Sequence, residues 1–128
     1  MILETRILTA VINYLDEKCT PFSKITTGGL FLNGSGNGGI NAEIAPGYAR
    51  SNYLDGGVFQ RMPVLFLIRH SKHQTAMETA FELAKAARES DEVHPSVVGI
   101  NVGTAPEFVQ RSGADYIYSL IINIDYLD

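Results

Sequence analysis

The sequence predicts an α+β domain in which a mixed or antiparallel β-sheet carries two α-helices on one face. Three observations support this prediction. Strand-forming residues dominate 58–70, and a segment with helical periodicity, 71–88, follows directly. A second helical stripe occupies 1–18, and the segment 116–126 alternates between apolar and polar side chains. Elements that are apolar on one face bury that face against each other, so one sheet covered by two helices is the simplest arrangement.

The N-terminal segment, Met1–Lys18, is predicted to be the first helix. Its apolar residues recur at helical spacing: Leu3, Ile7, Val11 and Tyr14. Thr20–Pro21 ends the helix, because the residue before a proline disfavours helical backbone angles. A short strand over Ile25–Leu32 is expected to follow.

The segment Asn33–Gly57 is predicted to form a glycine-rich β arm. It holds seven of the 12 glycines of the chain. A connection of this length is uncommon in a compact domain unless it is functional or flexible. Ile40–Ile44 alternates weakly between apolar and polar residues, so this part of the arm is expected to pair as a strand.

The strand over 58–70 leads into the second helix at Ser71. Gln74 stands three residues after Ser71, which is the spacing of a capping box at a helix start. Further along the helix, charged side chains share one face that is interpreted as solvated: Glu78, Glu82, Lys85 and Glu89.

The last third of the chain is predicted to contain two strands. Ser96–Val102 has the alternation of a strand, and Pro106–Ala114 is expected to be a turn or a short helical piece. In the final strand, the tyrosines and aliphatic residues share one face. Asp115 and Asp125 lie on the opposite face, and we interpret them as markers of the solvated side rather than, with Asp128, as paired catalytic carboxylates.

Length and composition favour a single domain covering residues 1–128. The net charge of -4, without a run of basic residues, argues against specific binding of nucleic acid. The longest apolar run, Val64–Ile68, is too short to cross a bilayer, so no membrane partner is expected. Glu4 and Arg6 interrupt the apolar core that a signal peptide needs, and we expect the chain to be made in a reducing cytoplasm.

Gly34, Gly36 and Gly39 match the spacing of a dinucleotide-binding turn. Such a turn binds a pyrophosphate through the N–H groups of a helix that begins directly after it. Pro46–Gly47 would stop a helix here within two turns, so a glycine loop without a cofactor is the favoured interpretation. A small nucleotide-binding protein that uses the Gly34–Gly39 loop is kept as an alternative.

The histidines and the single cysteine do not have the spacing of a metal site. His70 and His73 flank a strand–helix boundary, and His94 and Cys19 lie far from them in sequence, so we expect no metal. Lys18 is expected to lower the pKa of the Cys19 thiol slightly, but no histidine is near in sequence to activate it. A partly buried structural thiol is predicted, and neither catalytic residues nor cofactors are expected.

Several short segments occur in a distinctive order from residue 53 onward. They are Tyr53–Gly57, Pro63–Arg69, Gln74 with Ala76 at the start of an alanine-rich helix, Ala105–Gln110, Gly113, and Tyr116–Leu120. In this order and spacing the chain resembles the tail-terminator, or tail-completion, proteins of long-tailed bacteriophages, which are also classed as minor capsid proteins. The N-terminal helix fits the same pattern in length and position, and the glycine arm takes little part in it.

The resemblance implies a non-enzymatic structural protein of the virion, made in the cytoplasm of the bacterial host. Its subunits would form a ring, a hexamer on the tail, that caps the tail tube, terminates polymerisation and offers the head–tail joining surface. Its partners would be further copies of itself, the major tail-tube protein and the head-completion protein. A head-completion adaptor of the head–tail connector is the main alternative, because both are ring-forming assembly subunits.

Five side chains are predicted to contact another subunit or a partner: Tyr48, Arg50, Tyr53, Arg61 and Arg69. Taken by themselves, the arginines are more simply explained as keeping a strand edge soluble, and an acidic partner surface is the alternative that gives them a contact role. In a ring of heterologous contacts, an arm can become ordered on contact and an edge strand can pair with a neighbour.

Overall fold

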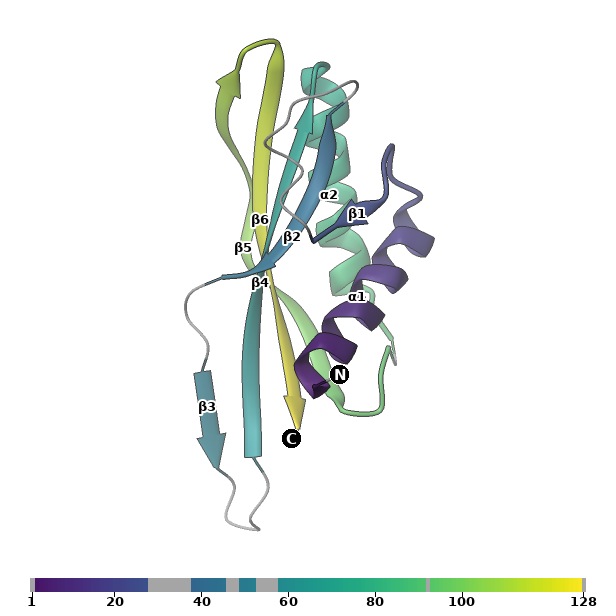
Figure 1. Ribbon diagram of the computed structural model, residues 1–128, viewed down its shortest axis with the longest axis vertical. Coiled ribbons are helices and arrows are strands. Elements are labelled where there is room, and N and C mark those ends of the chain that lie inside the picture. The colour runs from purple at the N-terminus through teal and green to yellow at the C-terminus, as the bar shows by residue number, and fades with distance from the viewer. Residues whose placement is uncertain (1, 28–37, 46–48, 53–57, 92, 128) are drawn as a thin grey trace.

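The computed structural model describes residues 2–27, 38–45, 49–52, 58–91 and 93–127. They form a single α+β domain with two layers, a mixed β-sheet and two helices packed against it (Figure 1). This result confirms the fold class that the sequence predicts. Parts of the predicted arm, including Tyr48 and Tyr53, lie outside the described residues.

The described strands are β1 (Ile25–Thr26), β2 (Gly39–Ile44), β3 (Ala49–Asn52), β4 (Val58–His70), β5 (Val97–Ser112) and β6 (Asp115–Leu127). Five of them follow the order β1-β2-β4-β6-β5, and β3 pairs with the remaining end of β4. The β1–β2 pair is parallel and the other pairs are antiparallel. The long strands β4 and β6 therefore form the centre of the sheet, and β5 forms one of its edges.

The two helices are α1 (Leu3–Cys19) and α2 (His73–Arg88), and both lie on the same side of the sheet (Figure 1). The α1 residues at helical spacing are buried, as the sequence predicts: Ile7, Val11 and Leu15. The buried stripe of α2 consists mainly of alanines: Ala76, Ala80, Ala84 and Ala87, with Leu83 among them. Because alanine is small, this stripe lets the axis of α2 lie close to the sheet. In the described part of the chain, no helix is long and apolar enough to span a membrane.

The core lies between the helices and the central strands. Alternate side chains of β4 and β6 point toward the helices and are completely buried: Met62, Val64, Phe66, Ile68, Leu120, Ile122, Ile124 and Tyr126. Burying an aliphatic or aromatic side chain of this size contributes about 1.5–3 kcal/mol. The Tyr126 hydroxyl also donates a hydrogen bond of 2.8 Å to Glu4 Oε2, which connects the start of α1 to the central strand.

Pro63 lies inside the central strand β4, although proline has no N–H for a strand ladder. The neighbours of β4 explain how it is accommodated. On the side away from β6, β2 pairs with Val64–Arg69 and β3 pairs with Val58–Arg61. Pro63 falls between these two stretches, where its carbonyl oxygen accepts a hydrogen bond from the Ala45 N–H at 2.9 Å. The missing N–H of Pro63 therefore removes only the hydrogen bond that would return to Ala45, at the point where the pairing of β4 changes from β2 to β3.

The prediction of a turn or helical piece at Pro106–Ala114 is wrong, because β5 continues to Ser112. Pro106 is tolerated since β5 is an edge strand and the pairing with β6 is irregular between Thr104 and Glu107. The reversal is a two-residue turn at Gly113–Ala114, between the paired residues Ser112 and Asp115. Gly113 has φ +60 there, a backbone conformation that favours glycine.

The predicted capping box at Ser71 is also absent. The N-cap of α2 is Lys72, and its side chain makes no capping hydrogen bond. Gln74 instead donates to Glu78 Oε1 at 2.9 Å, one turn along the helix. The Lys72 N–H donates to His70 Nδ1 at 2.9 Å, so the imidazole of His70 organises the tight connection from β4 into α2.

Two predictions about the arm are tested by the described residues. Ile40–Ile44 is expected to pair as a strand, and β2 does so in a regular antiparallel register with β4. The predicted strand Ile25–Leu32 is described only at Ile25–Thr26, which pair with Ile40 and Asn41 of β2.

Gly38 is expected to be intolerant of substitution. It has φ +90, and an added Cβ would overlap the backbone carbonyl group of Arg69. Gly38→Ala should therefore destabilise the domain by about 2 kcal/mol or more in chemical denaturation. Gly39→Ala is the matched control, because no atom lies within 4 Å of the added Cβ at that position. Equal stability of the two variants would contradict the close approach of Gly38 to β4.

Candidate functional site

The sheet face that is turned away from both helices carries two arginine–aspartate pairs. We call it the uncovered face, because no described helix packs on it. Arg61 and Asp125 lie directly opposite each other on β4 and β6. Arg61 Nε donates to Asp125 Oδ1 at 2.7 Å and Arg61 Nη2 donates to Asp125 Oδ2 at 3.0 Å. Asn101 of β5 adds a third donor to the same carboxylate, at 3.3 Å. The hydrogen bonds to Asp125 raise the pKa of the Arg61 guanidinium.

The second pair joins the other ends of the same two strands. Arg69 Nε donates to Asp115 Oδ2 at 2.6 Å. Arg69 lies opposite Ile117, so Asp115 is its diagonal neighbour on β6. The side chain of Arg69 is 15% exposed, whereas that of Arg61 is 43% exposed. The Arg69 pair is therefore the less hydrated of the two.

These pairs correct the interpretation of Asp115 and Asp125 as markers of a solvated side. Both residues are buried, at 7% and 8% exposure. The sequence pattern placed them on the correct face of β6, opposite the tyrosines, but it did not show that β4 brings an arginine to each carboxylate. The strand register is the missing information, because it pairs residues far apart in the sequence.

The predicted contact residues have different positions in the structure. Arg61 and Arg69 lie on the uncovered face of β4, and each is held by an aspartate of its own chain. Arg50 lies on β3 and pairs with Gln60 in the backbone register. The predictions for Tyr48 and Tyr53 lie outside the described residues. The structure therefore brings Arg61 and Arg69 onto one strand face.

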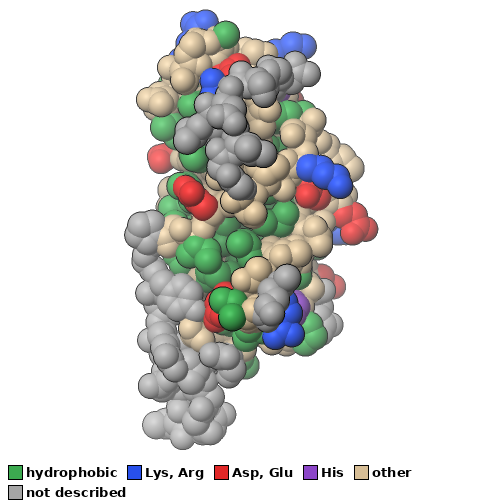
Figure 2. Space-filling model, in the orientation of Figure 1, with side chains coloured by type: hydrophobic (Ala, Val, Ile, Leu, Met, Phe, Trp, Pro, Cys, Tyr) green, Lys and Arg blue, Asp and Glu red, His purple; other side chains and the backbone are tan. Residues whose placement is uncertain are grey.

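Between the two charge pairs, the uncovered face is mainly apolar. Leu65 and Leu67 of β4 lie beside Ile121 and Ser119 of β6, and the aliphatic side chains are half-buried. Figure 2 shows hydrophobic side chains near the middle of the visible molecular face, with acidic and basic groups around them.

The outer edge of β5 is the longest strand edge of the described sheet. β5 pairs with β6 on one side, and no described strand lies on its other side. Three large apolar side chains of β5 are exposed: Val98, Phe108 and Val109. Two more exposed apolar side chains, Met77 and Phe81, lie on α2. An exposed edge of this kind is a template for pairing with another strand.

An aromatic cluster fixes the half of the β5–β6 hairpin nearest its turn to the start of α2. The His73 ring stacks on Tyr116 at 4.7 Å between ring centroids, with 9° between the planes. His73 Nε2 and the Tyr118 hydroxyl are 2.6 Å apart, and Phe108 lies 5.8 Å from the His73 ring. The Arg111 guanidinium lies over Tyr116, 5.1 Å from the ring centroid. Sequence reasoning missed this cluster because it assigned the segment around Phe108 to a turn.

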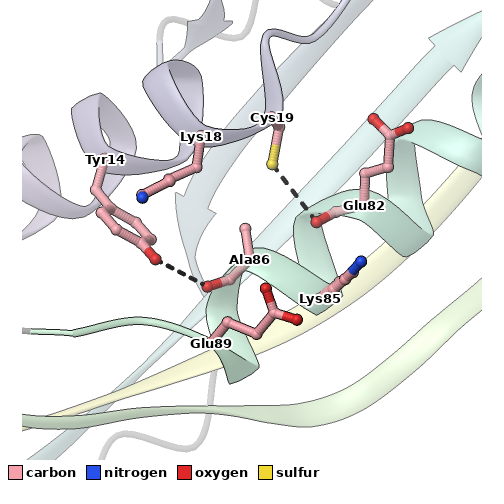
Figure 3. A pocket seen from close by; sticks show the side chains of 7 residues that line it. All are labelled: Tyr14, Lys18, Cys19, Glu82, Lys85, Ala86 and Glu89. Atoms are coloured by element: carbon pink, nitrogen blue, oxygen red, sulfur yellow. Dashed lines mark hydrogen bonds between the residues drawn. The ribbon is translucent and has the colours of Figure 1, made fainter.

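A groove of about 370 Å³ lies between α1 and α2. Figure 3 shows Tyr14 and Cys19 reaching from α1 toward the backbone of α2. The Tyr14 hydroxyl donates to the Ala86 carbonyl at 3.3 Å, and Cys19 Sγ donates to the Glu82 carbonyl at 3.5 Å. Burial, followed by the negative charge of Glu82, raises the pKa of Cys19 to about 11. The expected lowering by Lys18 is therefore wrong, and the thiol has a structural position between the helices.

The three histidines take part in local contacts. His94 Nδ1 accepts a hydrogen bond from the Ser96 N–H at 3.1 Å, at the start of β5. Phe22 packs edge-on against His70, with 4.7 Å between their ring centroids. Within the described ranges, no three metal-ligating side chains are grouped.

The glycine loop is followed by a strand. β2 begins at Gly39, the last glycine of the Gly34–Gly39 pattern. A dinucleotide-binding turn needs the N-terminus of a helix at this point, because the helix supplies the N–H groups for the pyrophosphate. The described backbone after Gly39 therefore lacks that group of donors.

No protein-family model matches the chain, and no curated protein matches it.

The partly buried thiol of Cys19 should react slowly in the folded protein. With a pKa of about 11 instead of 9.0, Cys19 should be alkylated by iodoacetamide at pH 8 about a hundredfold more slowly when folded than when unfolded in urea. The folded chain also retains this proton between pH 9.0 and about 11, where the unfolded chain releases it, so stability should fall as pH rises through this window. Equal alkylation rates in both states would contradict the burial of Cys19.

The two charge pairs should differ in their contribution to stability. In Asp115→Asn, the poorly hydrated Arg69 loses its carboxylate partner, and we expect a loss of about 2–3 kcal/mol in urea denaturation. In Asp125→Asn, the more exposed Arg61 can be hydrated, and we expect a loss of about 1 kcal/mol. A larger loss of stability for Asp125→Asn than for Asp115→Asn would show that the exposure of the arginine does not determine how much stability is lost.

Proposed function

We propose that this chain is a tail-terminator subunit of a long-tailed bacteriophage, a non-enzymatic protein that caps the tail tube as a ring. The observation that carries the proposal is the free edge of β5, which is 16 residues long and bears exposed apolar side chains. A ring subunit needs a surface that stays unsatisfied until the next subunit binds, and a strand edge beside apolar groups is such a surface.

The positions of the family-like segments also support the proposal. Pro63–Arg69 lies in the second half of β4, and Gln74 and Ala76 lie in the first turn of α2. Ala105–Gln110 and Tyr116–Leu120 form the two arms of the β5–β6 hairpin. The resemblance therefore falls on adjacent elements of one sheet and its covering helix, rather than on scattered surface positions.

In this function, the chain acts by contact. One face of the ring binds the end of the tube of major tail protein and prevents further addition. The other face presents the joining surface to the head-completion protein. The arm residues Tyr48, Arg50 and Tyr53, together with Arg61, are the proposed contact residues at these joints. Arg69 has less free surface, so its contribution would depend on its position on β4.

Neutralised charges suit a ring through which DNA passes. Arg61 and Arg69 are each paired with an aspartate, so neither presents a full positive charge to a polyanion. The chain as a whole carries a net charge of -4. A channel built from such subunits would not retain DNA by attraction.

The proposal is tested by the native mass of the purified chain over a concentration series, with negative-stain images of the same samples. We expect ring-shaped particles of about six subunits, and rings should be favoured at high concentration. The rings should also stop elongation when they are added to purified tail tubes. A chain that stays monomeric at every concentration and does not cap tubes would contradict the proposal.

A further inference from the structure

We propose that the subunits join edge to edge, with the outer edge of β5 in one copy pairing with the β2 edge of the next copy. This inference rests on the proposed ring function and specifies its interface. The partner is a second copy of this chain, because the same molecule carries two unlike strand edges on opposite sides of its sheet. Two unlike edges give a head-to-tail contact, which closes into a ring when the rotation between copies allows it.

The first part of the β5 edge lacks the charged residues that usually protect an edge from pairing. Val97–Ala105 contains no charged side chain, and Val98 is 59% exposed. The pairing of β5 with β6 has irregularities, for example between Val102 and Thr104 and between Thr104 and Glu107. Such bulges bend a strand, and a sheet that continues around a ring must bend at each junction.

The opposite edge is formed by β2 beyond the short strand β1. β1 pairs only with Ile40 and Asn41, so the Ala42–Ile44 part of β2 has β4 on one side and no described strand on the other. Ile44 is 50% exposed. β2 pairs with β4 without irregularity, so it offers a regular backbone to the bent edge of β5.

The directions of the strands fit this junction. β5 is antiparallel to β6, β6 to β4, and β4 to β2, so β2 runs opposite to β5 within one subunit. When copies are related by rotation about an axis along the strands, β5 of one copy meets β2 of the next in the antiparallel direction. A two-fold contact between two β5 edges would instead place two irregular strands against each other and close at a dimer.

Apolar groups beside both edges would be covered by the same contact. His73, Met77, Phe81 and Arg88 follow one line along α2, at spacings of four, four and seven residues. Both ends of this line lie beside β5: His73 packs near Phe108, and Arg88 lines a recess with Val97–Ile100. Met77 and Phe81 therefore flank the β5 edge on the helix side of the sheet. Ile44 lies on the helix side of β2, two residues after the buried Ala42.

The charges of the two edges are complementary. Glu43 is the only charged residue of β1 and β2, and it is exposed. Arg111 of β5 is exposed and, among the described residues, has no carboxylate within ion-pair distance. The proposed junction therefore brings an acidic side chain of one copy and a basic side chain of the next onto paired strands, with Arg111 seven residues along β5 from Thr104.

Cross-linking of single-cysteine variants tests which edges meet. Glu43, Leu65, Ile121 and Thr104 form one row across the sheet and its uncovered face, from the β2 edge to the β5 edge. Glu43→Cys and Thr104→Cys are each made in a Cys19→Ser background and treated with a short bismaleimide at millimolar protein concentration. The mixture of the two variants should give cross-linked dimers, and neither variant alone should do so.

Other cross-linking results would overturn the inference. Dimers from Thr104→Cys alone would show a two-fold contact between β5 edges. Rings in the images with no cross-link in the mixture would show that the subunits meet through another surface. That result would overturn the edge pairing but would agree with the proposed ring function. Monomers at millimolar concentration with no cross-link would overturn the self-pairing, and tube capping would then decide the ring function separately.

A charge placed on the edge gives an independent test with a matched control. Thr104→Lys puts a solvated ammonium group at the proposed junction and should weaken self-association at least about tenfold in light scattering. Thr9→Lys makes the same change at an exposed threonine of α1, outside both strands of the proposed junction, and should leave association unchanged. Equal association of the two variants, both folded by circular dichroism, would contradict the proposed edge.

Discussion

The pairing of β4 with β6 is the interaction on which the rest of this domain depends. The ladder runs from the Phe59–Leu127 pair to the His70–Tyr116 pair, and most of its helix-facing side chains are completely buried. Both helices pack onto this surface, and β2 and β5 extend it on either side. A change that disturbed this ladder would separate the helices from the sheet and the two edges from each other.

The same ladder places charges on the opposite face of the sheet. Register brings Arg61 to Asp125 and Arg69 to Asp115, so the ends of the uncovered face carry neutralised pairs while its middle carries leucine and isoleucine. Electrostatics in this position stabilises one register, because a slip by one residue would move each arginine to the helix side. The proposed contact role of Arg61 and Arg69 is therefore combined with a structural one.

The sequence allowed correct predictions where a single segment has a long, regular apolar repeat. It predicted both helices, the strands β4 and β6, and the strand within the arm, because each has a clear apolar repeat. It failed at the second half of β5, where Pro106 and exposed polar residues look like a turn but an edge strand tolerates them. It also failed for Asp115, Asp125 and the His73 cluster. Their partners come from strands and helices distant in sequence, and no local pattern contains that information.

The chain order of the central strands has a consequence for biosynthesis. β6 is the last strand in sequence, yet it lies in the middle of the sheet, between β4 and β5. During synthesis, β4 leaves the ribosome long before β6, and its apolar side chains have no sheet neighbour on that side until β6 follows. The hairpin of β5 and β6 closes through a two-residue turn, so bringing these two strands together has a low entropic cost. Until β6 pairs with it, β4 therefore presents an apolar strand edge to which other chains can pair.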